Sequence, residues 1–149
     1  MTGPPPGGLR GGSFDLNDMP DQAQTLAVLA LFADGPVDIR NVPNLRIKET
    51  DRLTALAREL VKFGAEVEER ADGIRVSAPE SPKPAVVETY GDHRMAMAFA
   101  LAGLRVPGTT ILDPACVEKT YPAFFDDLNE LAASGNEIAG RTGWRRTPT

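Results

Sequence analysis

Cysteine and histidine are nearly absent from this sequence of 149 residues, which has one of each, Cys116 and His93. A single cysteine cannot form an intramolecular disulfide, and one cysteine with one histidine cannot build the usual zinc site. No apolar run approaches the roughly 20 residues needed to span a bilayer. The net charge is −5, which excludes the broad basic surface typical of nucleic-acid-binding proteins. We therefore expect a cytoplasmic protein with no metal site and no nucleic-acid or membrane partner.

The common catalytic signatures are missing as well. The sequence contains no Walker loop, no G-x-G-x-x-G, no G-x-S-x-G and no H-E-x-x-H. Its hydrophobic content of 42% and charged content of 25% are those of an ordinary globular domain. Any chemistry must therefore come from polar residues that the fold brings together.

The hydrophobic pattern alternates between strand-like and helix-like segments, which indicates an α/β fold. We expect strands over 13–16, 37–40, 86–89 and 109–112, a hairpin of 66–69 and 74–77 turning at Asp72-Gly73, and helices over 22–33, 49–63, 92–103 and 122–133. Asp21 and Asp92 are predicted N-caps, and Gly64 is predicted to end the second helix. Residues 1–12 are predicted to be a flexible Pro/Gly-rich lead, 13–134 a domain, and 135–149 a loose tail.

An internal repeat underlies this alternation. Asp21 and Asp92 each open a helix, and Gly64 and Gly135 each follow a later one, with 71 positions between the members of each pair. The second copy lacks its closing hairpin. We therefore predict about one and two-thirds βαβαββ repeats, that is, an incomplete domain.

Unusual polar residues cluster at the predicted helix N-termini or in the loops before them. They are Asp21, Asn44, Lys48, Glu49, Arg52, Asp92, His93, Arg94 and Lys119. Singly, each has an ordinary role as a cap or a surface ion pair. Equivalent helix starts of a repeated α/β layer lie on the same edge, however, so we expect these groups to gather there. Cations, carboxylates and a histidine together suit the binding of polyanions and the movement of protons.

Four segments together resemble the EPSP synthase (3-phosphoshikimate 1-carboxyvinyltransferase) family. They are P-D at 20–21, N-L-R-I-K-E-T-D-R-L at 44–53, Y-G-D-H-R-M-A-M at 90–97 and D-P-A-C-V-E-K-T-Y-P at 113–122. The resemblance covers roughly residues 13–131 and corresponds to the C-terminal third of the family's sequences. It implies part of an inside-out α/β barrel, with sheets outward and helices packed toward the centre.

The resemblance also implies a reaction. The family transfers the enolpyruvyl group of phosphoenolpyruvate to the 5-hydroxyl of shikimate 3-phosphate, by addition and elimination and without cofactor or metal. This reaction belongs to the shikimate pathway of aromatic amino acid biosynthesis, and the herbicide glyphosate occupies the phosphoenolpyruvate site. Implied catalytic residues are Asp21, which takes the hydroxyl proton, Glu49, which serves the methylene carbon, and His93. Beside bound polyanions, we expect the pKa of Glu49 to be raised, as suits a proton donor.

Substrate binding is implied for a second, overlapping set of residues. Asp21, Asn44 and Lys48 correspond to ligands of shikimate 3-phosphate. Arg52, Arg94 and Lys119 correspond to the clamp on phosphoenolpyruvate. Both substrates are polyanions, so these cations offset the repulsion between them and position them.

The family's N-terminal motifs, an early Lys-Ser pair, N-A-G-T and Ser-Ser-Gln, do not occur here. We therefore expect the chain alone to be inactive, with the facing half supplied by the missing N-terminal part or by another copy of the chain. Two alternatives stay open. One is an enolpyruvyl transferase with a UDP-sugar acceptor, and the other is a non-catalytic anion-binding remnant.

Overall fold

The computed structural model describes residues 8–134, in which strands alternate with α-helices and short 3-10 helices (η). The first part contains β1 (Arg10–Asp15), η1 (Pro20–Gln22), α1 (Ala23–Leu29), η2 (Ala30–Phe32), β2 (Asp34–Arg40), η3 (Pro43–Ile47), α2 (Arg52–Lys62), β3 (Glu66–Arg70) and β4 (Gly73–Ser77). The second contains β5 (Val86–Val87), α3 (His93–Gly103), β6 (Thr110–Ile111), η4 (Pro114–Lys119) and α4 (Phe124–Ser134). Within this range no helix is both long and apolar enough to cross a bilayer.

The strands form two sheets, one for each copy of the repeat. Four strands pair in the order β1-β2-β4-β3, with β1 parallel to β2 and the other pairs antiparallel. β5 and β6 form a second, parallel pair. Parallel neighbours need a crossover, which α1 supplies in the first copy and α3 in the second. The 71-residue offset recurs in Pro43 and Pro114, which begin η3 and η4.

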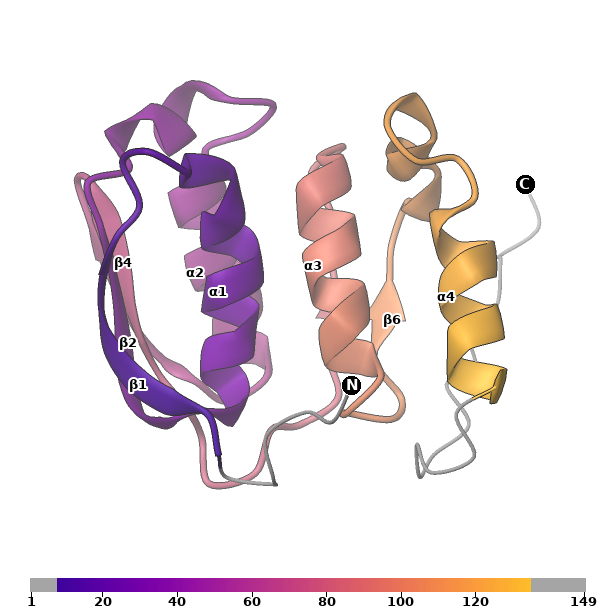
Figure 1. Cartoon of the computed structure of the whole chain (residues 1–149), viewed down its shortest axis with the longest axis horizontal. Helices are drawn as coiled ribbons and strands as arrows, with labels where there is room; N and C mark the ends of the chain where they lie inside the picture. Colours follow the sequence, from indigo (N-terminus) through magenta and orange to yellow (C-terminus); the bar gives the residue numbers. More distant parts are fainter. Residues whose placement is uncertain (1–7, 135–149) are drawn as a thin grey trace.

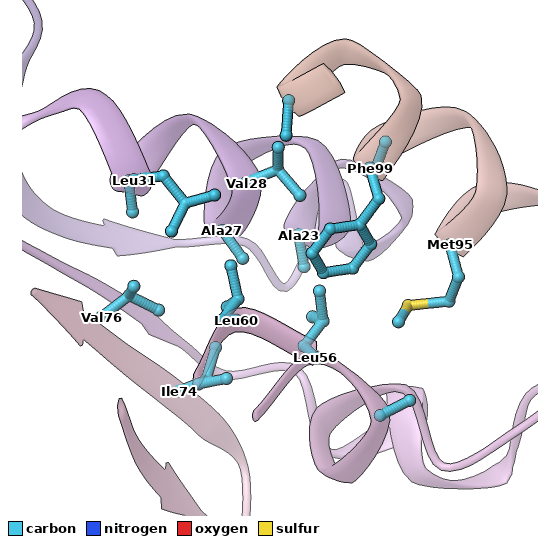
Figure 2. Packing of buried hydrophobic residues seen from close by; sticks show 14 of the residues in the cluster. Ala23, Ala27, Val28, Leu31, Leu56, Leu60, Ile74, Val76, Met95 and Phe99 are labelled. Carbon is cyan, nitrogen blue, oxygen red and sulfur yellow. The ribbon is translucent and has the colours of Figure 1, made fainter. Parts of the chain in front are cut away.

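Helices α1, α2 and α3 lie between the two sheets. In Figure 1, α1 and α2 cover one face of the four-stranded sheet, α3 stands beside them, and β6 and α4 lie on the far side. The core between these layers is apolar, and Figure 2 shows it from close by. Small residues such as Ala23 and Ala27 of α1 are fully buried, which lets α1 approach α3 closely. Phe63 and Phe99 stack at 5.8 Å between ring centroids, and so join the two copies of the repeat.

Several predicted boundaries are wrong by a few residues. β1 begins at Arg10, so the last three residues of the predicted lead belong to a strand. Residues 1–7 of that lead and the predicted tail, 135–149, lie outside the described residues. α2 begins at Arg52 and not at residue 49, because the Asp51 side chain accepts the N–H of Thr54 and caps the helix there. Gly64 follows the end of α2 with φ of 93°, as predicted.

The hairpin is confirmed, but its turn lies one residue earlier than predicted. Arg70 pairs with Gly73, which leaves Ala71 and Asp72 as the loop. Gly73 belongs to β4, where a Cβ atom would lie 2.2 Å from the carbonyl oxygen of Ile39. Glycine is therefore required here by the close approach of a neighbouring strand.

Candidate functional site

A buried arginine at the start of α2 organises the polar residues of the two repeats. Arg52 is only 1% exposed, yet its guanidinium contacts three carboxylates from three different segments. Nε donates to Asp92 at 2.7 Å, with a second bond from Nη2 at 3.3 Å. Nη1 donates to Asp21 at 3.0 Å, and Nη2 donates to Glu49 at 2.8 Å. The planar fork of arginine suits several carboxylates at once.

Asp92 has two functions in this cluster. Its carboxylate is fully buried, caps α3 by accepting the N–H of Arg94 at 2.8 Å, and pairs with Arg52. The sequence predicted only the cap. Because Arg52 opens α2 and Asp92 caps α3, the N-terminal ends of these helices lie against each other. A cation is unfavourable at a helix N-terminus, and here the protein's own carboxylates offset it.

Asp21 is not the N-cap that the sequence predicted. It lies inside η1, and no side-chain hydrogen bond caps either η1 or α1. Its two oxygens contact two different arginines, Arg52 at 3.0 Å and Arg94 at 3.0 Å. Pro20 starts the 3-10 turn one residue earlier, and both carboxylate oxygens of Asp21 accept from arginines. Asp21 thus links the first repeat to the second.

Glu49 joins a third segment to the cluster. Its Oε1 accepts from Nζ of Lys119 at 3.1 Å, across 70 positions of sequence. Its own backbone N–H and the Lys119 ammonium lower the pKa of Glu49 to about 2. This differs from the raised pKa expected beside bound anions, because the groups that face Glu49 in this structure are cations.

His93, the first residue of α3, is buried beside Glu49. Its Nδ1 lies 3.7 Å from Glu49 Oε1, too far for a hydrogen bond, and has no other partner in the described part of the chain. Burial lowers the pKa of His93, although the carboxylates of Asp92 and Glu49 act in the opposite direction. The imidazole is therefore held mostly neutral at neutral pH, with one ring nitrogen unsatisfied.

Six of the eight predicted site residues thus form one connected group, and two do not. Asn44 lies in η3, and Lys48 follows η3; both are exposed. Within residues 8–134, neither side chain makes a recorded hydrogen bond or ion pair. Lys48 and Lys119 are 71 positions apart and hold equivalent places in the two copies, Lys48 directly after η3 and Lys119 as the last residue of η4. Lys119 is paired with Glu49, whereas Lys48 faces solvent.

Arg46, to which sequence reasoning assigned no role, holds the segment that carries Asn44 and Lys48. Its guanidinium donates to the carbonyls of Ala71, at 2.9 Å, and Arg70. It also pairs with Asp51 at 2.9 Å and with Glu69 at 2.8 Å. Arg46 therefore ties η3 to the hairpin and to the start of α2. Its position between Asn44 and Lys48, two predicted ligands, was the sequence signal that could have pointed to this role.

The cluster is balanced in charge. Three cations, Arg52, Arg94 and Lys119, face three carboxylates, and within the described residues no group of three potential ligands is placed to hold a metal ion. The cations differ in exposure: the Arg94 and Lys119 side chains are 35% and 55% exposed, and Arg52 is buried. An incoming anion can therefore reach Arg94 and Lys119 more easily than Arg52.

Comparisons with known proteins identify the family of the chain. A family model described as EPSP synthase (3-phosphoshikimate 1-carboxyvinyltransferase) matches residues 2–128. The 3-phosphoshikimate 1-carboxyvinyltransferase of Mannheimia succiniciproducens is 54% identical over 128 residues, which are 85% of this chain and 30% of that protein. The protein of the same name from Escherichia coli O127:H6 is 51% identical over 129 residues, 87% of this chain and 30% of that protein.

Solved structures give the same result. An EPSP synthase from Acinetobacter baumannii superimposes with a TM-score of 0.73 at 29% identity, over 84% of this chain and 30% of that one. A second structure of EPSP synthase from that organism gives a TM-score of 0.67 at 26% identity. The predicted fold class is thereby confirmed, and the chain spans about 30% of the length of the relatives that it matches. This chain belongs to the EPSP synthase family.

Proposed function

We propose that this chain supplies one part of an active site that transfers the enolpyruvyl group of phosphoenolpyruvate to the 5-hydroxyl of shikimate 3-phosphate. The observation that carries the proposal is the gathering of charged side chains around the buried guanidinium of Arg52. Asp21 and Glu49 contact it directly, and Arg94 is linked to it through Asp21. The proposed location is the cytoplasm, in keeping with a single free cysteine, Cys116.

Binding proceeds by exchange of ion-pair partners. The carboxylate and phosphate of phosphoenolpyruvate take Arg94 from Asp21 and Lys119 from Glu49, because both of these pairs are partly exposed. Arg52 keeps its buried partner Asp92 and holds the site in place. Asn44 and Lys48, which are exposed, bind shikimate 3-phosphate.

This exchange sets up the two carboxylates for chemistry. Once Lys119 has moved to the substrate, Glu49 loses a cation and gains an anionic neighbour, and its pKa rises from about 2. Glu49 then donates a proton to the methylene carbon of phosphoenolpyruvate, while Asp21 takes the proton of the attacking 5-hydroxyl. In the second step Glu49 recovers a proton from the new methyl group as the carbon–oxygen bond to phosphate breaks, and the proton held by Asp21 leaves with the phosphate.

Anion binding by the purified chain tests this proposal. Calorimetric titration should show binding of phosphoenolpyruvate, weakened about tenfold or more in Arg94→Ala and Lys119→Ala, since a hydrogen bond to a charged group contributes about 1.5–3 kcal/mol. Lys83→Ala and Arg70→Ala are the matched controls, because both remove a cation outside the cluster and should leave binding unchanged. Equal dissociation constants in all four variants would refute the assignment.

The acceptor is tested in parallel. Shikimate 3-phosphate should bind, with Lys48→Ala weakening it, and a UDP-sugar should not; the reverse preference would favour the alternative acceptor. We expect no turnover by the chain alone, and turnover on addition of the remaining part of a relative. Appreciable turnover without that addition would overturn this expectation. Anion binding with no turnover in either case would identify a non-catalytic remnant.

A further inference from the structure

A second buried carboxylate lies outside the cluster and contacts the segment that leads into it. Glu59 of α2 is 0% exposed. Its Oε1 accepts from the hydroxyl of Tyr90 at 2.8 Å, and its Oε2 accepts from the backbone N–H of Glu88 at 3.0 Å. Lys62 donates to the same Oε2 at 2.6 Å and to the carbonyl of Val86 at 3.1 Å. Glu59 thus binds the stretch from β5 to the start of α3 at two points directly and at a third through Lys62.

That stretch contains an unfavourable turn. Tyr90 and Gly91 both have positive φ, 55° and 66°, and the N–H of Asp92 donates to the carbonyl of Thr89 at 2.9 Å. Glycine adopts this conformation freely, whereas tyrosine does so only where its surroundings hold it. The hydrogen bond from the Tyr90 hydroxyl to Glu59 is such a restraint. Burial and the nearby Glu59 carboxylate raise the pKa of Tyr90 to about 12, so the hydroxyl keeps its proton.

The residues directly after this turn are those that meet Arg52. Asp92 pairs with Arg52, His93 lies beside Glu49, and Arg94 pairs with Asp21. A change in the backbone at Tyr90 or Gly91 would therefore displace all three side chains together. A shift of about 1 Å in such groups is enough to impair a site.

We propose that Glu59 is a positioning residue, which holds the Thr89–Asp92 turn through Tyr90 and so places Asp92, His93 and Arg94 against Arg52. The effect of this placement on anion binding rests on the proposed function. The structural role of Glu59 in holding the turn does not depend on that function. Among residues 8–134, the hydrogen bonds and ion pairs of Glu59 are with Lys62, Glu88 and Tyr90 and none is with the groups around Arg52, so we expect it to act through the turn.

The single histidine of the chain reports on this placement. The pKa of His93 is measured directly from its ring resonance by NMR, and the groups that face it are Asp92, Glu49, Lys119 and Arg94. In Glu59→Gln and Tyr90→Phe, a loosened turn exposes the ring to water, so the pKa of His93 should rise toward its ordinary value. Val76→Ala is the matched control: it destabilises the core at β4, far from the turn in sequence, and should leave the pKa of His93 unchanged.

Three results decide the proposal. A raised pKa in both variants but not in Val76→Ala supports it, and a pKa that is unchanged in both, or raised equally in the control, overturns it. If Glu59→Gln does not fold, Tyr90→Phe carries the same test, because it removes only one hydroxyl. In the same samples, phosphoenolpyruvate should bind about fivefold more weakly to Tyr90→Phe, the loss expected for one hydrogen bond. If the unaltered chain does not bind phosphoenolpyruvate, the proposed function fails while the pKa result still decides the placement.

Discussion

Replacing Arg52 by methionine should destabilise the whole domain, because the change leaves a buried charge without a partner. Asp92 is 0% exposed, and after the change only the N–H of Arg94 remains among the recorded donors to its side chain. Breaking a buried ion pair from one side costs about 3–5 kcal/mol. The total stability of a domain is about 5–15 kcal/mol, so roughly a fifth or more of it is at stake. Asp21 and Glu49 also lose a partner, but they are partly exposed and water can solvate them, so they add little to the loss of stability.

The second half of this prediction concerns the double variant. Asp92→Asn removes the orphaned charge, and asparagine still serves as an N-cap for α3. Arg52→Met with Asp92→Asn should therefore be more stable than Arg52→Met alone, and the two changes should be strongly non-additive. Urea denaturation followed by circular dichroism gives all four free energies of unfolding.

The control is Arg70→Met, which removes an exposed arginine that pairs with two carboxylates. Arg70 contacts Asp38 and Glu68 with its side chain 34% exposed, so its loss should destabilise the domain much less than the loss of Arg52. A loss of under about 1 kcal/mol for Arg52→Met, or an additive double variant, would refute the reasoning about burial.

Two further predictions concern acid and a close contact. The pKa of His93 is lowered from 6.5, and that of Glu49 is lowered from 4.5 to about 2. The stability that each group adds is therefore fully present when the pH is above its ordinary pKa, and it is lost as the pH falls through its pKa in the folded protein. The urea concentration at which half of the protein is unfolded should therefore decrease when the pH drops below about 6.5, and decrease again when it drops below about 4.5. The second decrease should be smaller in Glu49→Gln. An increase of this urea concentration on acidification would contradict the prediction. Gly73→Ala should lower the thermal midpoint, because its Cβ would meet the carbonyl of Ile39, whereas Gly12→Ala meets only the movable ring of Phe14. Equal melting of the two glycine variants would count against the contact.

The order of elements was largely predictable from the sequence, because each depends on local signals. Hydrophobic periodicity and the glycine after α2 depend only on neighbouring residues, and both predictions are confirmed. The gathering of distant polar groups followed from the 71-residue repeat, since equivalent helix starts share an edge. Exact boundaries did not follow, because the choice between Glu49 and Arg52 as the start of α2 depends on which side chain caps the helix, and Asp51 does so.

The partners of the charged groups could not be predicted from the sequence. Asp21 and Asp92 have the same local pattern, yet Asp92 caps a helix and Asp21 joins two arginines. Both carboxylates pair with Arg52, which is 31 positions from Asp21 and 40 from Asp92 in the chain, so no local pattern shows this pairing. Glu59 was missed for a similar reason, since a glutamate in the middle of a helix gives no sign that it is buried against Tyr90. Long-range pairing is a property of the packed molecule and leaves no periodic trace.

The two lysines at equivalent places in the repeat have different surroundings. Lys119 is bound to Glu49, while Lys48 has no recorded partner among residues 8–134. A duplicated backbone has thus produced one occupied ammonium and one available ammonium. For protein engineers this means that copying a repeat reproduces the geometry of a ligand but not its readiness to bind, which has to be designed through the neighbour that competes for it.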